Sequence, residues 1–181
     1  MLRFFTKKKP NAVVRRLYDA AVEQARLPIF YQTFGVADTL DGRFDMVVFH
    51  VWPVIDALRQ DDGAISEDGQ ALFDAFVEDM EQNLRSIGVG DTTFPKKMKQ
   101  IGKAFYGRFG AYREAGDDAA LAAAIARNVL DDESLATSPK ARALVRYARA
   151  MQEAAGTGDV LTAFRYPEPA AYAAIAEGET Q

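Results

Sequence analysis

The stretch SEDGQALFDAFVEDMEQNLRSIGVGDTTFPKKMKQIGKAFYGRFGAY, residues 66–112, decides the fold. Its first part repeats apolar residues at steps of three and four, which predicts an amphipathic helix opened by Ser66. These residues are Leu72, Phe73, Phe76, Val77, Met80 and Leu84. Its second part predicts another helix, started by Pro95, with Met98, Ile101, Phe105, Phe109 and Tyr112 on one face. The two segments predict a helical hairpin.

The connection between these helices has the composition of a tight turn. Gly88 is placed as a left-handed helix cap, and Gly90 and Asp91 complete the turn. The sequence Gly-Val-Gly-Asp lacks the Gly-x-x-x-x-Gly-Lys-Ser/Thr spacing of a phosphate-binding loop, and no strand precedes it. The turn is therefore structural in this interpretation, and a nucleotide site is not expected.

The two hairpin helices carry opposite charge. Every charged residue between 67 and 81 is acidic, and every one between 96 and 113 is basic. Antiparallel packing would pair these flanks, although exposed pairs contribute only about 0–1 kcal/mol each. Asp79 lies near the edge of the apolar stripe, where a partly buried carboxylate needs a partner. We expect Lys97 or Arg108 to pair with it.

One face of the basic helix looks outward at helical spacing. Lys96, Lys99 and Lys103 fall together with Tyr106 beside them, away from the apolar stripe. A tyrosine among lysines suits a surface that recognises another macromolecule. Three interpretations stay open: a protein-binding face, a face that binds RNA or the ribosome, and a solvated basic face.

The remaining segments also indicate helices, so the sequence predicts an all-α protein. Expected helices run from Asn11 to about Arg26, from Asp117 to Leu130, and from Ser138 to near Gly156. The run VVFHVWPVI has strand-like residue types, but we predict a helix because no partner strand is present. A flexible basic N-terminus (1–10), one helical domain (11–166) and a loosely ordered tail (167–181) are expected. No internal repeat is found.

Composition excludes several classes of function. The 181 residues carry a net charge of -4, include no cysteine and include one histidine, His50. Disulfides, cysteine catalysis, a usual zinc site and a Ser-His-Asp triad are therefore not expected. His50 is interpreted as a hydrogen-bonded core residue. The N-terminus lacks the apolar region of a secretory signal, so a cytoplasmic protein is expected, with at most peripheral membrane contact.

Two further groups of residues are singled out by position. Phe30, Tyr31 and Phe34 form an aromatic group beside Pro28, which places them in the core or facing a bound client protein. The glycines at 102, 107 and 110 each cost about 1 kcal/mol in a helix relative to alanine. Close approach of another backbone would explain why they are there.

Two blocks together resemble a known family. GVADTLDGRFDMVVFHVW (35–52) and FVEDMEQNLRSIGVGDTTFPKKMKQIGKAFYGRFGAY (76–112) are similar to the ubiquinol–cytochrome c chaperone family. The shared features include Asp-Thr-x-x-Gly-Arg-Phe, Gly-Val-Gly-Asp, Lys-x-Met-Lys and Ala-Phe-Tyr-Gly-Arg. The similarity runs from about residue 11 to 130. Ala37 stands where proline is expected, and Pro95 precedes the lysines where none is expected.

The resemblance implies an all-helical, non-enzymatic chaperone for assembly of the cytochrome bc1 complex, without a cofactor or metal. It implies binding of newly made cytochrome b, a small partner protein and a contact near the ribosomal exit. Candidate partner-binding residues are Asp79, Arg85, Lys96, Lys97, Lys99, Lys103, Tyr106 and Arg108. Candidate structural residues are Asp38, Gly42, Arg43, His50, Gly88, Gly90 and Asp91. The absence of a transit peptide favours a bacterial member.

Overall fold

The computed structural model describes residues 12–60 and 62–178, and the described chain is a single all-α domain. The predicted fold class is confirmed. The α-helices are α1 (Ala12–Ala25), α2 (Pro28–Gln32), α3 (Leu40–Ala57), α4 (Glu67–Ser86), α5 (Phe94–Arg113), α6 (Asp118–Asn128), α7 (Pro139–Gly156), α8 (Val160–Ala163) and α9 (Ala173–Ala176). Two 3-10 helices, η1 (Glu133–Thr137) and η2 (Pro169–Tyr172), complete the set. The predicted N-terminal segment, residues 1–10, lies outside the described residues.

Helix α3 forms the centre of the molecule. Thr39 caps it by accepting a hydrogen bond from the Gly42 backbone N–H at 3.1 Å. The run from Asp45 to Ile55 is buried throughout, because α1, α4, α5 and α7 all pack around α3. Burial on every side explains why an apolar, β-branched run forms a helix here. Pro53 lies inside α3. The helix prediction for this run is confirmed.

The fully buried His50 joins several elements of the core. Its Nδ1 lies 2.8 Å from the Met46 carbonyl oxygen, so Nδ1 carries the proton and donates. Its Nε2 then accepts from the Tyr147 hydroxyl at 3.0 Å, and Gln24 donates to that hydroxyl oxygen. Burial lowers the pKa of His50 to about 4. His50 is a neutral core residue that links α1, α3 and α7.

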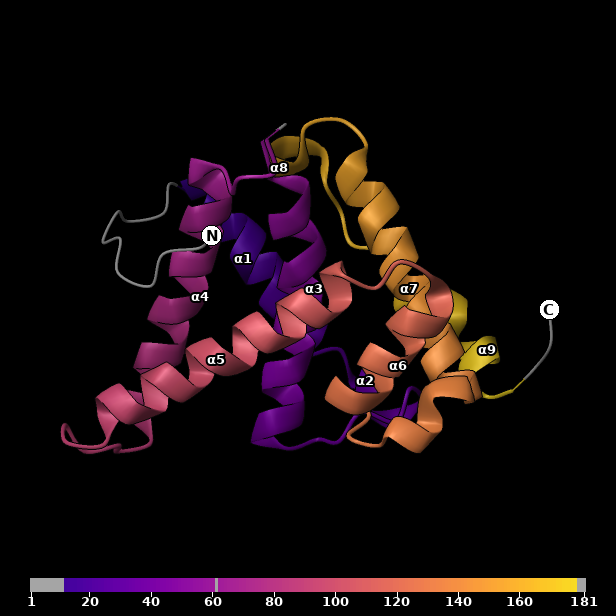
Figure 1. Cartoon of the computed structure of the whole chain (residues 1–181), viewed down its shortest axis with the longest axis horizontal. Coiled ribbons are helices and arrows are strands. Elements are labelled where there is room, and N and C mark those ends of the chain that lie inside the picture. Colours follow the sequence, from indigo (N-terminus) through magenta and orange to yellow (C-terminus); the bar gives the residue numbers. More distant parts are fainter. Residues whose placement is uncertain (1–11, 61, 179–181) are drawn as a thin grey trace.

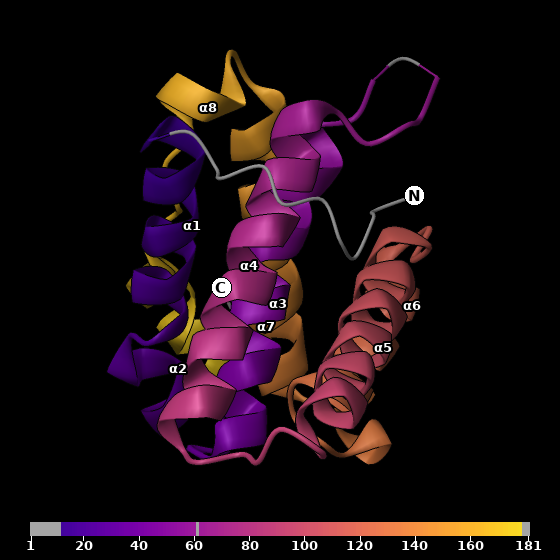
Figure 2. The same ribbon diagram turned by 90° about the vertical axis from the view of Figure 1, so that its left-hand side faces the viewer.

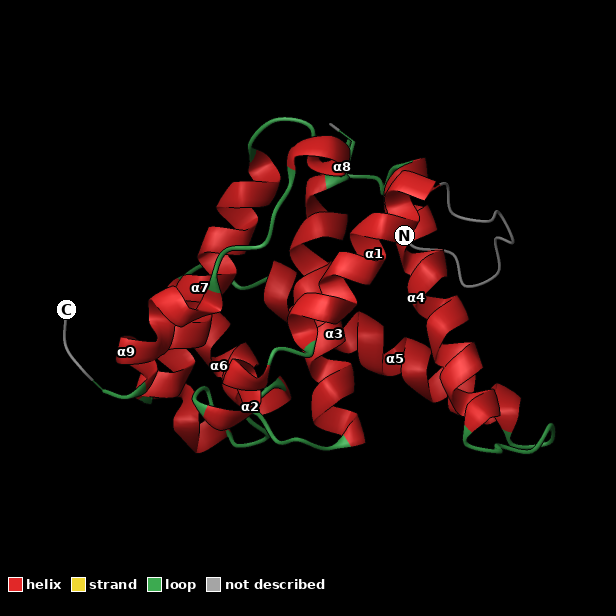
Figure 3. Cartoon of the chain, turned by 180° about the vertical axis from the view of Figure 1, so that it is seen from behind, coloured by secondary structure: helices red, strands yellow, loops and turns green. Residues whose placement is uncertain are grey.

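The C-terminal segment differs from its prediction as a loosely ordered tail from residue 167. The Tyr166 hydroxyl donates to the His50 carbonyl oxygen at 2.9 Å. Beyond it, η2 and α9 pack against α7, and Ala176 is buried. Figure 3 shows the segment leaving α8 as a loop beside α7 before these last turns. Small alanine side chains let these short turns approach α7 closely, a packing feature that composition did not reveal.

The hairpin of α4 and α5 stands to one side of this core. Figure 1 shows α4 descending to the turn and α5 running obliquely from that turn across α3. Figure 2 shows α1, α4 and α3 close together, with the turn after α4 crossing to α5. Across residues 12–60 and 62–178, none of the helices is both long enough and apolar enough to cross a membrane.

Candidate functional site: the α4–α5 hairpin

Helix caps and turn residues close together in the sequence define the ends of the two hairpin helices. Ser66 caps α4 by accepting from the Gly69 backbone N–H at 3.1 Å. Gly88 has a φ of 78°, and the Val89 N–H bonds the Leu84 carbonyl oxygen at 3.1 Å, which closes the end of α4. The Thr93 hydroxyl bonds the Gly90 carbonyl oxygen at 2.9 Å just before α5. The turn is thus held by hydrogen bonds among its own residues.

An aromatic cluster holds the two helices together away from the turn. The ring of Phe105 lies 4.9 Å from that of Phe73 and 4.8 Å from that of Phe76. Tyr106 packs against Phe73 at 5.6 Å. The helices are therefore joined at the turn and at this cluster, and the surface between these two joints is hollowed on both sides of the hairpin.

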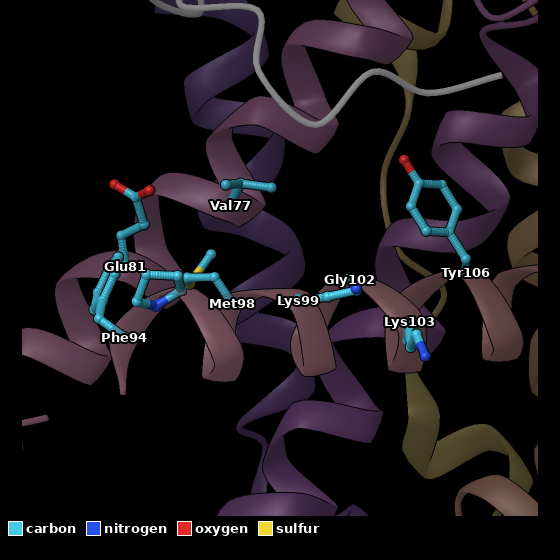
Figure 4. Close-up of a pocket in the computed structure, with 9 residues that line it drawn as sticks. Val77, Glu81, Phe94, Met98, Lys99, Gly102, Lys103 and Tyr106 are labelled. Atoms are coloured by element: carbon cyan, nitrogen blue, oxygen red, sulfur yellow. The ribbon is translucent and has the colours of Figure 1, made fainter. Parts of the chain in front are cut away.

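The first hollow is the apolar groove, with a volume of about 610 Å³. It is lined by Val77, Glu81, Phe94, Pro95, Met98, Lys99, Gly102, Lys103 and Tyr106. Figure 4 shows Val77 and Glu81 on the α4 side and the remaining labelled residues on the α5 side. Among the described residues that line it, Glu81, Lys99 and Lys103 carry a charge. Its volume lies within the roughly 300–1,000 Å³ of ordinary ligand sites.

The second hollow is the mixed groove, with a volume of about 540 Å³, between α3, α4 and α5. Its apolar lining includes Phe44, Met80 and Ile101. Leu40 and Ile87 line it while remaining 77% and 66% exposed. Its charged lining residues are Arg26, Asp41, Arg43, Asp79, Lys97 and Arg108. It therefore offers both apolar and charged contacts.

Arg108 binds Asp45, not Asp79. The two side chains form an ion pair between α5 and α3, and the Arg108 guanidinium lies 5.3 Å from the Phe44 ring. Burial raises the pKa of Asp45 to about 6, although Arg108 acts to lower it. The pair therefore anchors the hairpin to the core at a partly dehydrated site.

Asp79 has a different partner from the one predicted. Its carboxylate accepts a hydrogen bond from the Tyr18 hydroxyl of α1 at 2.8 Å. Burial, with Asp79 adding to it, raises the pKa of Tyr18. The expectation of Lys97 or Arg108 was wrong because α1, which packs along α4, supplies the donor, while Asp45 of α3 engages Arg108.

Three residues of the predicted basic face line one of the grooves. Lys99, Lys103 and Tyr106 line the apolar groove, Lys97 lines the mixed groove, and Lys96 is exposed without lining either groove. A Cβ at Gly107 would meet nothing within 4 Å, and one at Gly110 would meet the Glu114 Oε1 at 4.0 Å. The close backbone approach expected there does not occur within the described residues.

The other turn and cap residues take structural positions. Arg85 stacks on Phe94 at 4.5 Å, and Arg43 pairs with Asp38 at 2.7 Å. A Cβ at Gly42 would lie 2.0 Å from the Ala37 carbonyl oxygen, so only glycine fits there. Gly90 and Asp91 lie exposed in the turn.

The aromatic group near Pro28 belongs to the core. Phe30 and Phe34 are fully buried, and the Tyr31 hydroxyl donates to the Ala25 carbonyl oxygen at 2.7 Å. Phe30 packs against His50 and Tyr147. Of the two interpretations, the structure places Phe30 and Phe34 in the core, while Tyr31 is half-buried.

Sequence reasoning found several charged residues of the grooves but missed their apolar lining. Val77 and Met98 were assigned to apolar stripes, and Phe94, Leu40 and Ile87 were not singled out. Spacing shows that a residue lies on an apolar face, but it does not show whether another element covers that face. Among residues 12–60 and 62–178, no group of three His, Asp or Glu side chains gathers to hold a metal ion.

Comparison with known proteins gives consistent matches. A family model described as ubiquinol-cytochrome C chaperone matches residues 32–159. The chain is 28% identical over 131 residues to ubiquinol-cytochrome-c reductase complex assembly factor 1 of Xenopus laevis, covering 71% of this chain and 66% of that protein. The human protein of that name is 26% identical over 125 residues, which cover 68% of this chain and 42% of the human protein. The chain thus spans less than two thirds of these curated relatives.

A solved structure extends the match to most of the chain. The crystal structure of the Cbp3 homolog from Brucella abortus superposes with a TM-score of 0.76 at 32% identity. The superposition covers 89% of this chain and 92% of that one. The arrangement of helices described above is therefore shared across nearly the full length of both chains.

Proposed function

The chain belongs to the ubiquinol–cytochrome c chaperone family, and on that premise we propose that it is a non-enzymatic assembly factor of the cytochrome bc1 complex that binds newly made cytochrome b. The names of its relatives, which describe assembly of ubiquinol–cytochrome c reductase, support this function. The proposal places the protein at the inner face of the cytoplasmic membrane, where such a client is inserted.

The apolar groove is the observation that carries the proposal. A chaperone for a membrane subunit has to cover apolar client surface without forming part of the final complex. A groove between two helices performs this task by accepting the apolar face of a client helix. Lys99 and Lys103 on its rim add points where acidic client residues can pair.

The titratable residues support a non-enzymatic role. His50 is enclosed by core hydrogen bonds, Asp79 is bonded to Tyr18, and Tyr106 packs on Phe73. Each group thus has separate neighbours, whereas catalysis needs a nucleophile, a base and an orienting group together.

RNA or ribosome binding through Lys96, Lys99 and Lys103 is the other candidate from sequence. Two of these lysines line an apolar groove, which suits an apolar ligand better than the charged backbone of RNA. The comparisons give no support to this alternative, and binding to RNA would weaken steeply with salt. We also propose that the protein binds a small partner protein and contacts the ribosome.

The test is complementation in cells that depend on the cytochrome bc1 complex and lack this gene. The variant K99E/K103E reverses two charges four residues apart on the groove rim. The matched control R142E/R146E reverses two charges at the same spacing on exposed positions of α7. We expect the first variant to lower cytochrome b abundance and bc1 absorbance, and the control to restore both.

The same strains give a direct binding readout. Affinity purification of tagged protein from membranes should recover cytochrome b with the wild type and control, and less with K99E/K103E. Normal cytochrome bc1 spectra in the deletion strain would refute the proposed function. Recovery of ribosomal RNA that disappears at moderate salt would favour the other candidate.

A further inference from the structure

The end of the α4–α5 hairpin carries an exposed aliphatic side chain. Ile87, which directly precedes the turn, is 66% exposed, and Val89 and Phe94 are half-buried. Figure 1 shows this turn at the opposite end of the long axis from α9. The Val89 N–H donates to the Leu84 carbonyl oxygen at 3.1 Å, so the turn is shaped by its own hydrogen bonds. Ile87 is therefore held outward on a formed turn.

The same end of the hairpin is basic, although the whole chain carries a net charge of -4. Residues 81–103 include two anions, Glu81 and Asp91, and five cations, Arg85, Lys96, Lys97, Lys99 and Lys103. All five cations are exposed. Within residues 12–60 and 62–178, none of the four lysines forms an ion pair. Their charge is therefore not neutralised by the described part of the chain.

An anionic bilayer matches both properties of this surface. Each lysine or arginine near an anionic leaflet strengthens binding by about 5-fold, and the head-group region accepts an aliphatic side chain. RNA would engage the lysines but leave Ile87 in water, because contacts to its phosphates are polar. The combination of cations with an exposed aliphatic residue thus favours a lipid surface.

Both grooves reach this end of the hairpin. Phe94 and Pro95 line the apolar groove, and Ile87 and Lys97 line the mixed groove. Figure 4 shows Phe94 at one end of the row of labelled α5 residues along the apolar groove. A bilayer that binds the end of the hairpin therefore lies next to both grooves.

We propose that the end of the hairpin docks on the anionic surface of a lipid bilayer, with Ile87 in the head-group region and Arg85, Lys96 and Lys97 against the lipid phosphates. Docking holds the ends of both grooves at the bilayer, where an apolar client helix can pass from lipid to protein. In this respect the inference rests on the proposed function, because its client is a membrane subunit. It adds the surface that binds the membrane and the lipid charge that this surface requires.

Flotation of the full chain with vesicles tests the charge contribution. We expect binding to vesicles of phosphatidylcholine mixed with phosphatidylglycerol, and binding about 10-fold weaker or less to phosphatidylcholine alone or at raised salt. K96E/K97E should weaken binding to the mixed vesicles by about 20-fold or more, because two attractive contacts become repulsive. The control R142E/R146E makes the same charge change at exposed positions of α7 and should stay within about 2-fold of the wild type.

Two variants of Ile87 test the aliphatic contribution. I87S should weaken binding to the mixed vesicles by about 5-fold or more, because it removes most of the apolar surface that the bilayer covers. I87L should bind as the wild type does. Urea unfolding checks that all variants remain folded. Equal wild-type binding to both kinds of vesicle would overturn the proposal, and so would unchanged binding by K96E/K97E or by I87S.

A tryptophan at position 87 reports insertion directly. Trp52 is fully buried, so brominated acyl chains do not reach it. With brominated phosphatidylcholine mixed with phosphatidylglycerol, the fluorescence added by I87W should fall by about 2-fold or more, because the side chain enters the boundary of head groups and acyl chains. The control E153W, at an exposed position of α7, should keep its fluorescence. Equal quenching of both, or none of I87W, would overturn the insertion.

Failure of the docking and failure of the proposed function are distinguishable. The vesicle assays contain no cytochrome b, so they decide the docking even if the deletion strain has normal bc1 spectra and the function is refuted. If the wild type does not bind mixed vesicles, the docking is overturned, while complementation still decides the function. Salt-sensitive retention of the wild type on transfer RNA without vesicle binding would overturn the docking in favour of RNA.

Discussion

The aromatic core around His50 and the α4–α5 hairpin use similar residue types with opposite results. In the core, Phe30, Phe49 and Tyr147 are fully buried, and both nitrogens of His50 are hydrogen-bonded. In the hairpin, Phe94 is half-buried and Ile87 is 66% exposed. The difference lies in the number of elements that converge: α1, α2, α3 and α7 close the core, whereas the hairpin leaves hollows beside it. Apolar residues therefore fill the interior in the core, whereas in the hairpin some of them line open grooves.

The largest expected effect tests whether the core carries the stability. F49A should lower the free energy of unfolding by about 3–5 kcal/mol, because it leaves a cavity beside Trp52, Tyr112 and Tyr147. F94A, at the groove, should cost about 1 kcal/mol or less, because the Phe94 side chain is already partly hydrated. Urea unfolding followed by Trp52 fluorescence measures both. Equal losses would remove the distinction between the two regions.

The next effect concerns the ion pair that joins the regions. R108M should cost about 2–4 kcal/mol, because it leaves the Asp45 carboxylate buried without its cation. The lower end of this range reflects partial hydration of the Arg108 side chain. D45N/R108M should recover part of the loss, since no charge then remains buried. Urea unfolding of D45N, R108M and the double variant forms a double-mutant cycle, which gives the coupling free energy between Asp45 and Arg108. Additive losses would show that the pair does not anchor the hairpin.

Opposite pKa shifts on α3 give the two regions opposite responses to acid. The pKa of Asp45 is raised to about 6, so the folded state binds its proton more tightly than the unfolded state does. Lowering the pH from 6.5 to 4 therefore stabilises the fold through Asp45. The pKa of His50 is lowered to about 4, so the unfolded state takes up that proton first, and the same acidification destabilises the fold.

Two variants separate these contributions. Relative to the wild type, D45N should lose stability more steeply between pH 6.5 and 4, because the stabilising protonation is absent. H50Q should lose stability less steeply, whatever its stability at neutral pH. Urea midpoints across this range give both slopes. Parallel slopes in the wild type and both variants would contradict the assignment of these protons.

The sequence predicted the regular elements well because their signals are local. Ser66 and Thr39 cap helices through backbone contacts three residues away, and Gly88 adopts the left-handed conformation expected of it. The partner of Asp79 was missed because Tyr18 lies 61 residues away along the chain. Side-chain pairing depends on which helices become neighbours, and helical spacing carries no information about that.

The grooves were missed for the same reason. Val77 and Met98 repeat at core spacing, yet they line an open groove, because no further helix of residues 12–60 and 62–178 covers the hairpin there. Phe30 and Phe34 were assigned either to the core or to a client-facing surface, because no helix face accommodated them. Both are fully buried, Phe30 in the short helix α2 and Phe34 just after it. An apolar pattern identifies residues that avoid water, while the tertiary arrangement decides whether the protein itself or a partner covers them.

The smallest expected effect asks whether the outer face of α5 also binds. A Cβ at Gly107 meets nothing within 4 Å, so G107A should raise stability by about 0.5–1 kcal/mol through the helix preference of alanine. G156A, at the end of α7 where space is also open, is the matched control. Thermal unfolding measures stability, and capture of cytochrome b measures binding.

If G107A raises stability but weakens capture of cytochrome b, Gly107 has a role in binding. The glycine would then be retained because a partner backbone approaches α5 closely, which a methyl group prevents, and the stability forgone would be the cost of that contact. G156A should raise or maintain stability and leave capture unchanged. If G107A stabilises the protein and captures cytochrome b as well as the wild type does, binding is confined to the hollowed sides of the hairpin, and the outer face of α5 is a solvated surface.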